Sequence, residues 1–188
     1  MTPMADYYFI SQLPSLDGIG EDAPLPITEE RFAELCDRFL GKRAKAVLEK
    51  LTLSPKRQGE GSGSALIDAW HESERSLRFA LGRIRAEKLG RSFDTEGRPL
   101  PADCIKAART ATEAKTPMEA ERYLNGYRLE ILEALRPMDG FSEDHIFYYA
   151  LKLKLLLRIR QFDTVSGEHA YKNIYDSILN GDRLEATQ

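Results

Sequence analysis

The segment over residues 146–162 constrains the fold more than any other part of this sequence. Drawn as a helix, with about 100° between successive residues, it carries apolar side chains in two stripes on nearly opposite sides. The stripes are Ile146, Ala150, Leu153 and Leu157, and Leu151, Leu155, Ile159 and Phe162. A helix that is apolar on nearly all sides must be covered by several neighbours. We therefore predict that this helix lies at the centre of the fold or at an interface with a partner.

Four basic side chains interrupt this apolar segment, namely Lys152, Lys154, Arg158 and Arg160. Because a buried charge is costly unless it is paired, these side chains must reach solvent, meet carboxylates of neighbouring helices, or contact a partner. Reaching solvent is the simplest explanation, and a partner contact is the functional alternative, so we name all four as candidate partner contacts. The segment also falls short of the roughly 20 apolar residues that cross a bilayer, so no direct membrane insertion is expected.

Helix start and stop signals divide much of the remaining chain into helices. Thr28, followed by two glutamates, is predicted to cap a helix that Gly41 ends, with a short helix over residues 42–51 after it. A long amphipathic helix is predicted over residues 66–89. Thr116, Pro117 and Glu119 predict the start of the next long helix, whose apolar stripe would be Ala120, Leu124, Tyr127, Ile131 and Leu135.

Other segments give weaker signals. Ser142 is predicted to cap the 146–162 helix, and a last helix is expected over residues 167–180, before a frayed tail at 184–188. An alanine-rich helix within residues 99–116 has little apolar area, so we predict that it is peripheral. Residues 5–13 remain open between strand and helix, because so short an apolar run fits either.

Taken together, these elements predict an all-α fold, a helical bundle of about six to seven helices in a single domain over residues 1–188. Residues 15–26 read as a loop, and the polar, glycine-rich residues 54–64 read as a flexible loop.

The charge balance and the cysteines limit which classes of partner and which cellular location are expected. The chain has 30 acidic and 27 basic residues, for a net charge of −3, which gives no general attraction to nucleic acid or anionic lipid. Within the 66–89 helix, glutamates at positions 72, 74 and 87 have the spacing to pair with Arg75, Arg78 and Arg83, so no nucleic-acid surface is expected. Cys36 and Cys104 lack ligand spacing, and with no secretory leader the expected location is the cytoplasm.

A search for reactive constellations finds none. His71 and Glu72 begin a zinc-protease pattern, but position 75 is arginine where the second histidine would stand. His145 and His169 lie near helix starts, where capping contacts explain them, and carboxylate pairs such as Glu72 and Glu74 are expected on polar faces. We therefore expect no catalytic residue, no metal, no cofactor and no enzyme activity.

Three stretches resemble a bacterial family of unassigned function. They are ADYYFISQLP at residues 5–14, PITEERF at 26–32, and YYALKLKLLLR at 148–158. Members of that family are typically encoded in V-type ATP synthase operons and look distantly similar to the C subunit of that enzyme, the equivalent of the eukaryotic d subunit. The resemblance follows the order of elements over most of the chain, but no catalytic motif anchors it.

The resemblance implies a fold and a set of partners. The C subunit is an all-helical socket that joins the central stalk to the membrane ring and has no active site. A lobe similar to it would make this chain a non-catalytic structural or accessory component of a bacterial V-type ATPase, cytoplasmic and peripheral to the inner membrane through the complex. The chain is much shorter than the three-lobed C subunit, which leaves a reduced version or an assembly factor.

Two alternatives remain open. A helical adaptor unrelated to rotary ATPases would share every feature above and differ only in its partner. A small-ligand-binding helical bundle would be favoured by a buried polar pocket that collects His71, His145 or several carboxylates.

Overall fold

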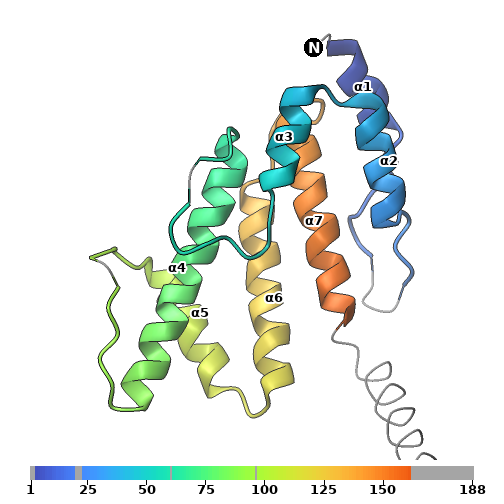
Figure 1. Ribbon diagram of the computed structural model, residues 1–188. Helices are drawn as coiled ribbons and strands as arrows, with labels where there is room; N and C mark the ends of the chain where they lie inside the picture. The colour runs from blue at the N-terminus through green and yellow to red at the C-terminus, as the bar shows by residue number, and fades with distance from the viewer. Residues whose placement is uncertain (1–2, 20–22, 60, 96, 162–188) are drawn as a thin grey trace, which may run out of the picture.

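The computed structural model describes residues 3–19, 23–59, 61–95 and 97–161. In these residues it contains seven α-helices and no strand, which confirms the predicted all-α bundle. The helices are α1 (Pro3–Ser11), α2 (Glu29–Phe39), α3 (Lys42–Lys50), α4 (Ala65–Lys88), α5 (Ala102–Glu113), α6 (Pro117–Ala134) and α7 (Glu143–Gln161). Figure 1 shows α4, α6 and α7 roughly upright, with α5 against α4 and α6, and with α1 to α3 gathered around the upper part of α7.

Cap residues set the helix starts much as the sequence predicts. The side-chain hydroxyls of Thr28, Thr116 and Ser142 each accept a hydrogen bond from the backbone amide three residues later, over 3.1, 3.1 and 3.3 Å. The Glu119 carboxylate turns back toward the helix start and accepts from the amide of Lys115, the residue before the cap Thr116.

The aromatic run near the N-terminus, which the sequence leaves open, is helical. Phe9 of α1 is fully buried, and its ring stacks on Phe32 and Phe39 of α2 at centroid distances of 6.1 and 5.9 Å. Tyr7 and Tyr8, on the other sides of α1, are exposed. These contacts with α2 account for the helical conformation of the segment. Periodicity over nine residues does not reveal them.

The apolar core consists of two clusters of buried side chains. The first lies among α1, α2, α3, α7, the first part of α4 and the later part of α6, and the second lies among the later part of α4, α5 and the first part of α6. The first cluster encloses α7 on both predicted stripes. Its covered side chains there are Ile146, Ala150, Leu151, Leu153 and Leu155. The central position of this half of α7 is confirmed, while Leu157 and Ile159 farther along are half-buried.

Helix α5 lies in the second cluster, so the prediction that it is peripheral is wrong. One face of α5 is buried against α4 and α6 through Cys104, Ala107, Ala108 and Ala111. Alanine offers little apolar area, which is why the sequence favours a peripheral place. Short side chains instead let two helices approach closely, because the distance between helix axes depends on the side chains at the contact.

A buried ion pair, which we call the polar layer, separates the two clusters. The Nε atom of Arg128 on α6 donates to Oε1 of Glu74 on α4 at 2.7 Å, and the two side chains are 7% and 2% exposed. Glu74 lies between Trp70 of the first cluster and Leu77 of the second, and Arg128 has the equivalent place on α6. The two long helices therefore meet through charge at mid-height and through apolar contacts above and below.

The polar layer corrects two predictions. The sequence predicts Glu74 on a polar face and paired with Arg78, but Glu74 is buried, and Arg78 donates to the backbone carbonyl of Pro55 at 3.0 Å. The reason is spacing, since Glu74 stands one turn from Trp70 on the apolar stripe. The second correction concerns α6, whose buried face differs from the predicted apolar stripe and includes Arg128. The buried residues of α6 are Leu124, Asn125, Arg128 and Leu132.

Some predicted features fall outside the described residues. These are Phe162, the helix at 167–180 with His169, and the tail at 184–188. The predicted loop at residues 54–64 contains no helix in its described part. Its last turn is bound to α4, where the amide of Ser62 donates to Asp68 Oδ1 at 2.7 Å. Among the described helices, none is both long enough and apolar enough to cross a membrane.

Candidate functional site

The first candidate residue, Lys152, is buried in the middle of α7 and bound to two carboxylates. Its Nζ donates to Oε1 of Glu133 on α6 at 2.5 Å, to the hydroxyl of Tyr148 at 3.2 Å, and to Oδ1 of Asp17. The Asp17 carboxylate also contacts Arg136 at 3.3 Å. Lys152 therefore connects the loop after α1 to α6 and α7.

The electrostatics of this cluster follow from its hydrogen bonds. Burial alone would lower the pKa of Lys152, but the hydrogen bonds to Asp17 and Glu133 outweigh it and raise that pKa. The Lys152 hydrogen bond lowers the pKa of Asp17. Burial, together with the 2.6 Å hydrogen bond to Glu133, raises the pKa of the Tyr148 hydroxyl to about 12. The lysine therefore stays charged and the tyrosine stays neutral at physiological pH.

The other three basic residues also have partners within the chain. Lys154 lies 3.4 Å from a carboxylate oxygen of Glu29, and Arg158 Nη2 lies 2.5 Å from Oε1 of Glu121. Arg160 donates to the backbone carbonyl of Ala23.

All four basic side chains therefore contact groups on neighbouring segments of the chain. Lys152 in particular is buried and does not reach solvent. A role in partner contact stays a prediction for Lys154, Arg158 and Arg160, which are less buried. Lys154 and Arg158 share a shallow groove of about 350 Å³ with Leu51, Leu53 and Leu157.

The two histidines that the structure describes, His71 and His145, lie on different helices, α4 and α7. His71 is buried on α4, and its Nε2 has no hydrogen-bond partner among the described residues. Burial and Arg75 lower the pKa of His71, while burial and Arg136 lower that of His145, so both imidazoles favour the neutral form. Within the described part of the chain, no three side chains of the metal-binding types come together at one place.

A cavity of about 210 Å³ between α1, the following loop and α7 collects His145 with Asp17 and Lys152. It meets part of the condition for a small-ligand site, because it holds one histidine and one carboxylate in a half-enclosed space. Its strongest donor, however, is already bound to the carboxylates of Asp17 and Glu133.

Both cysteines are buried and free. Burial raises the pKa of the Cys36 thiol to about 12, and burial also raises that of Cys104, whose Sγ lies 3.2 Å from the hydroxyl of Tyr127. A nucleophilic cysteine needs its thiolate near neutral pH, and both environments oppose it.

The feature that stands out on the surface is a group of exposed aromatic side chains, which we call the aromatic patch and define as Tyr7, Tyr8 and Phe141. Tyr7 stacks on Phe141 at a centroid distance of 4.8 Å and meets Tyr8 edge-on at 6.4 Å. The three side chains are 54%, 60% and 53% exposed. Met138, in the same connection between α6 and α7 as Phe141, is fully exposed.

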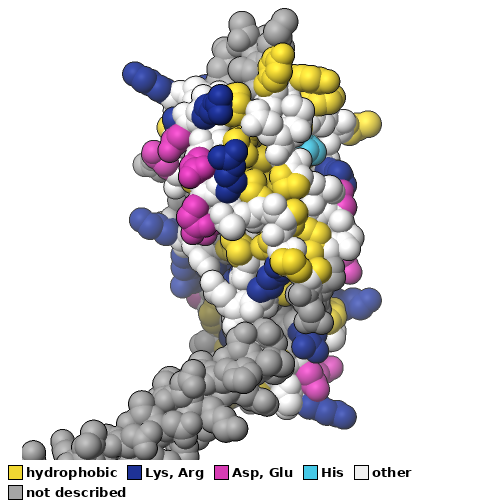
Figure 2. Space-filling model, turned by 90° about the vertical axis from the view of Figure 1, so that its right-hand side faces the viewer, with side chains coloured by type: hydrophobic (Ala, Val, Ile, Leu, Met, Phe, Trp, Pro, Cys, Tyr) yellow, Lys and Arg dark blue, Asp and Glu magenta, His cyan; other side chains and the backbone are white. Residues whose placement is uncertain are grey.

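Figure 2 shows the side of the molecule formed by α1 and α2, where hydrophobic side chains gather at the upper end and continue downward between charged ones. Scattered apolar residues are normal on a protein surface, but contiguous exposed aromatic groups mark interaction sites. The aromatic patch is therefore the best candidate for a docking surface in the described part of the chain.

Sequence reasoning missed this patch and the polar layer for different reasons. Tyr7 and Tyr8 belong to a segment whose conformation the sequence leaves open, and the stacking of Tyr7 on Phe141 joins two distant parts of the chain. The sequence does contain a signal for the burial of Glu74, because this glutamate stands where the helical spacing of the apolar stripe calls for an apolar side chain. Its partner Arg128 likewise stands one turn from Leu124 and from Leu132 on α6.

Comparison with known proteins gives no further assignment: no family model matches this chain, nor does any curated protein or solved structure show significant similarity to it.

Proposed function

We propose that this protein is a non-enzymatic helical component or accessory of a bacterial V-type ATPase, which holds its partners through the aromatic patch. The patch is the single observation that carries the docking role. Aromatic side chains are enriched at protein interfaces and dominate their binding energy, since a rigid ring buries a large area at low entropic cost. The identity of the partner rests on the three stretches that resemble the V-type ATP synthase operon family.

The rest of the molecule is suited to such a role. Its three long helices α4, α6 and α7 are held together by two buried apolar clusters and by ion pairs such as Glu74 with Arg128 and Lys152 with Glu133, so the fold provides a rigid support for exposed groups. Peripheral attachment from the cytoplasm, through the complex, follows from the same proposal. The stalk and the membrane ring are the expected partners.

Co-purification from native membranes tests the proposal. We expect tagged wild-type protein to recover stalk or ring subunits, and a Tyr7→Ser, Phe141→Ser double variant to recover at least about tenfold less. Truncating an aromatic hot spot typically costs about 1 kcal/mol or more, so the two changes together cost about 2 kcal/mol or more. The matched control is Tyr123→Ser, which removes a tyrosine on α6 that is 39% exposed outside the patch.

The two parts of the proposal fail separately. A wild-type protein that never recovers stalk or ring subunits would count against the ATPase assignment. A double variant that recovers them as well as the Tyr123→Ser control would count against the aromatic patch. Thermal melting of each variant checks that the fold is intact, and these exposed positions should shift stability little.

One observation favours a second function. The cavity with His145, Asp17 and Lys152 meets part of the condition for a small-ligand site. A Lys152→Met variant would remove its central donor, so binding of a carboxylate or phosphate to wild type but not to this variant would favour that alternative.

A further inference from the structure

The half-enclosed cavity of about 210 Å³ between α1, the following loop and α7 has a lining of mixed character. We call it the α1–α7 cavity. Its lining includes Ile10 and Leu13 from the N-terminal segment and His145, Tyr148 and Lys152 from α7. We propose that the α1–α7 cavity binds an uncharged aromatic ring that carries one hydrogen-bonding group, as phenols and indoles do. This inference goes beyond the proposed function and does not depend on the identity of the partner.

The charged side chains at the cavity use their charges within the protein. An ammonium group has three donors, and Lys152 uses them for two carboxylates and one hydroxyl. These acceptors are Asp17, Glu133 and Tyr148. Arg136 lies 3.3 Å from Asp17 and 3.6 Å from Glu133. Two basic groups thus meet two acidic groups, and an added ion would have to break one of these pairs. The cavity therefore favours an uncharged ligand.

The rest of the wall is apolar and aromatic. Leu16, Tyr148 and Tyr149 are buried, and Ile10 and Leu13 are half-buried. Burial raises the pKa of both tyrosine hydroxyls to about 12, so neither ring carries charge at neutral pH. Aromatic rings gain from edge-on or offset packing beyond the area that they bury. A planar ring in the cavity would make such contacts with the two tyrosines.

His145 keeps unused capacity for hydrogen bonding. Its Nδ1 atom is buried and has no hydrogen-bond partner among the described residues. Burial and the nearby Arg136 lower the pKa of His145, so the imidazole is neutral at physiological pH and can either donate or accept. A buried polar atom without a partner costs free energy, and a ligand hydroxyl or N–H at the imidazole would recover part of that cost.

The volume sets the size of the ligand. An apolar cavity of about 150 Å³ holds benzene, so the α1–α7 cavity admits one ring with a small substituent. Because the cavity is half-enclosed, the far side of the ring can extend toward solvent. The ring can therefore come from a free small molecule or from a tyrosine or tryptophan side chain of another protein.

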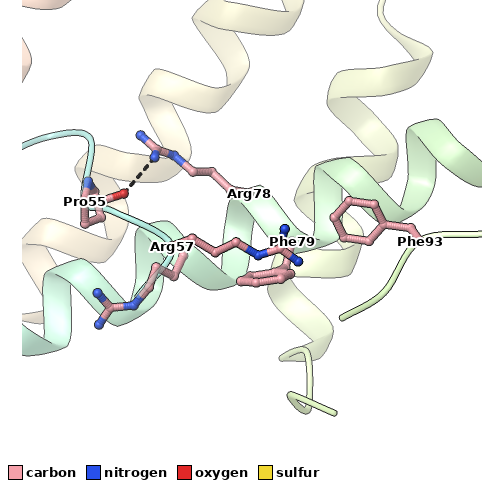
Figure 3. Close-up of a pocket in the computed structure, with 6 residues that line it drawn as sticks. Pro55, Arg57, Arg78, Phe79 and Phe93 are labelled. Atoms are coloured by element: carbon pink, nitrogen blue, oxygen red, sulfur yellow. Dashed lines mark hydrogen bonds between the residues drawn. The ribbon is translucent and has the colours of Figure 1, made fainter. Parts of the chain in front are cut away.

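The pocket on α4 that is drawn in Figure 3 lacks these properties. Its volume is about 180 Å³, and arginines form much of its lining. Figure 3 shows Arg78 reaching the backbone carbonyl of Pro55, at 3.0 Å, while the guanidinium of Arg57 lies over the ring of Phe79 at 4.9 Å. These groups do not meet at one point, so the pocket offers a ligand no shared position.

Ligand-observed NMR and calorimetry of the full chain with p-cresol, toluene and benzoate test the proposal. We expect p-cresol to bind at millimolar concentration, and toluene to bind about fivefold more weakly because it lacks the hydroxyl. Benzoate, which carries a charge, should not bind detectably. N-acetyl-tyrosinamide distinguishes the two sources of the ring. If it binds like p-cresol, a side chain of another protein can enter, and if p-cresol alone binds, the ligand is a free molecule.

Three variants make the test specific. Leu13→Phe should weaken p-cresol by at least about tenfold, because the added ring occupies space that the ligand requires. Leu89→Phe is the matched control, since residue 89 ends α4 outside the cavity and is 69% exposed, and it should leave the affinity unchanged. His145→Phe keeps a ring and removes the hydrogen bond, so p-cresol and toluene should then bind equally.

Several outcomes would overturn the proposal. Wild-type protein that binds neither p-cresol nor toluene would refute it, and benzoate that binds as tightly as p-cresol would favour an anion site instead. Equal weakening by Leu13→Phe and Leu89→Phe would place the ring elsewhere. An unchanged preference for p-cresol in His145→Phe would refute the hydrogen bond. Thermal melting checks that each variant folds, and nuclear Overhauser effects between p-cresol and the Ile10 methyl groups locate the ring in wild type without any variant.

Discussion

Replacing Glu74 by alanine removes one partner of the polar layer and leaves the Arg128 guanidinium buried between two apolar clusters. Breaking a buried ion pair by removing one partner typically costs about 3–5 kcal/mol. Arg128 would keep Asn125 Oδ1 at 3.1 Å and Glu121 at 3.5 Å. We therefore expect a loss near the lower end, about 3 kcal/mol of unfolding free energy, which corresponds to about 6–12 °C in melting temperature for a chain of this size.

Removing the other partner, Arg128, should cost more unfolding free energy. In Arg128→Met, the Glu74 carboxylate loses its hydrogen-bond partner at Oε1, and its Oε2 atom already has none among the described residues. The whole carboxylate is then buried without compensation. We expect a loss of about 4–5 kcal/mol, larger than that of Glu74→Ala. Replacing both residues, as Glu74→Leu with Arg128→Met, should restore most of the loss, because an apolar pair of similar volume is often as stable as a buried ion pair.

Urea denaturation of wild type and of each variant measures these differences. With the single variant Glu74→Leu added, wild type, Glu74→Leu, Arg128→Met and the double variant form a double-mutant cycle. Glu87→Ala is the control, since it breaks an exposed pair with Arg83 on the same helix and should cost no more than about 0.5 kcal/mol. A Glu74→Ala variant as stable as this control would refute the reasoning. It would mean that water reaches the polar layer and that the two core clusters are not separated by a buried charge.

Three further predictions concern α7 and His71. Leu153→Asp places an unpaired charge at a position that is 1% exposed and should cost several kcal/mol, so unchanged thermal melting would show that α7 is not enclosed. Lys152→Met should cost about 1–2 kcal/mol and speed limited proteolysis after α1, because Asp17 loses its link to α7 while remaining half-exposed; equal digestion rates would contradict this. Unfolding free energy should fall as pH drops below about 6.5, because burial and Arg75 lower the pKa of His71 in the folded protein, so the unfolded chain takes up the proton first. Urea titrations at about pH 7.5 and 5.5 should show a smaller fall in His71→Gln, and an equal fall would refute this role.

Local signals are sufficient for most helix boundaries. A hydroxyl at the cap, a proline after it and a glycine at the end act within one turn, so Thr28 and Thr116 can be assigned without knowledge of the neighbours. The two stripes of α7 likewise predict its enclosure, because a helix with apolar side chains all round has few other stable environments.

What the sequence could not predict depends on contacts between distant segments. The conformation of residues 5–13 is fixed by stacking of Phe9 on α2, and the place of α5 by how closely alanine lets it approach α4. The candidate site shows the same limit. Lys152 stands out in the sequence as a charge that needs compensation, but its carboxylates come from a loop and from α6, and the nearest of these in sequence lies 19 positions away.

The bonds between the loop after α1 and α7 have a consequence during synthesis of the chain. Tyr149 donates its hydroxyl to the carbonyl of Pro14 at 2.8 Å, and Lys152 binds Asp17, each across 135 positions. At roughly 5–20 residues per second, a ribosome needs about 7–27 seconds to make that interval. The Asp17 carboxylate and the ring of Phe32, which stacks on Tyr149 at 5.5 Å, therefore lack their partners on α7 for that time in every nascent chain. A chaperone that shields the emerging N-terminal segment would raise the yield of folded protein.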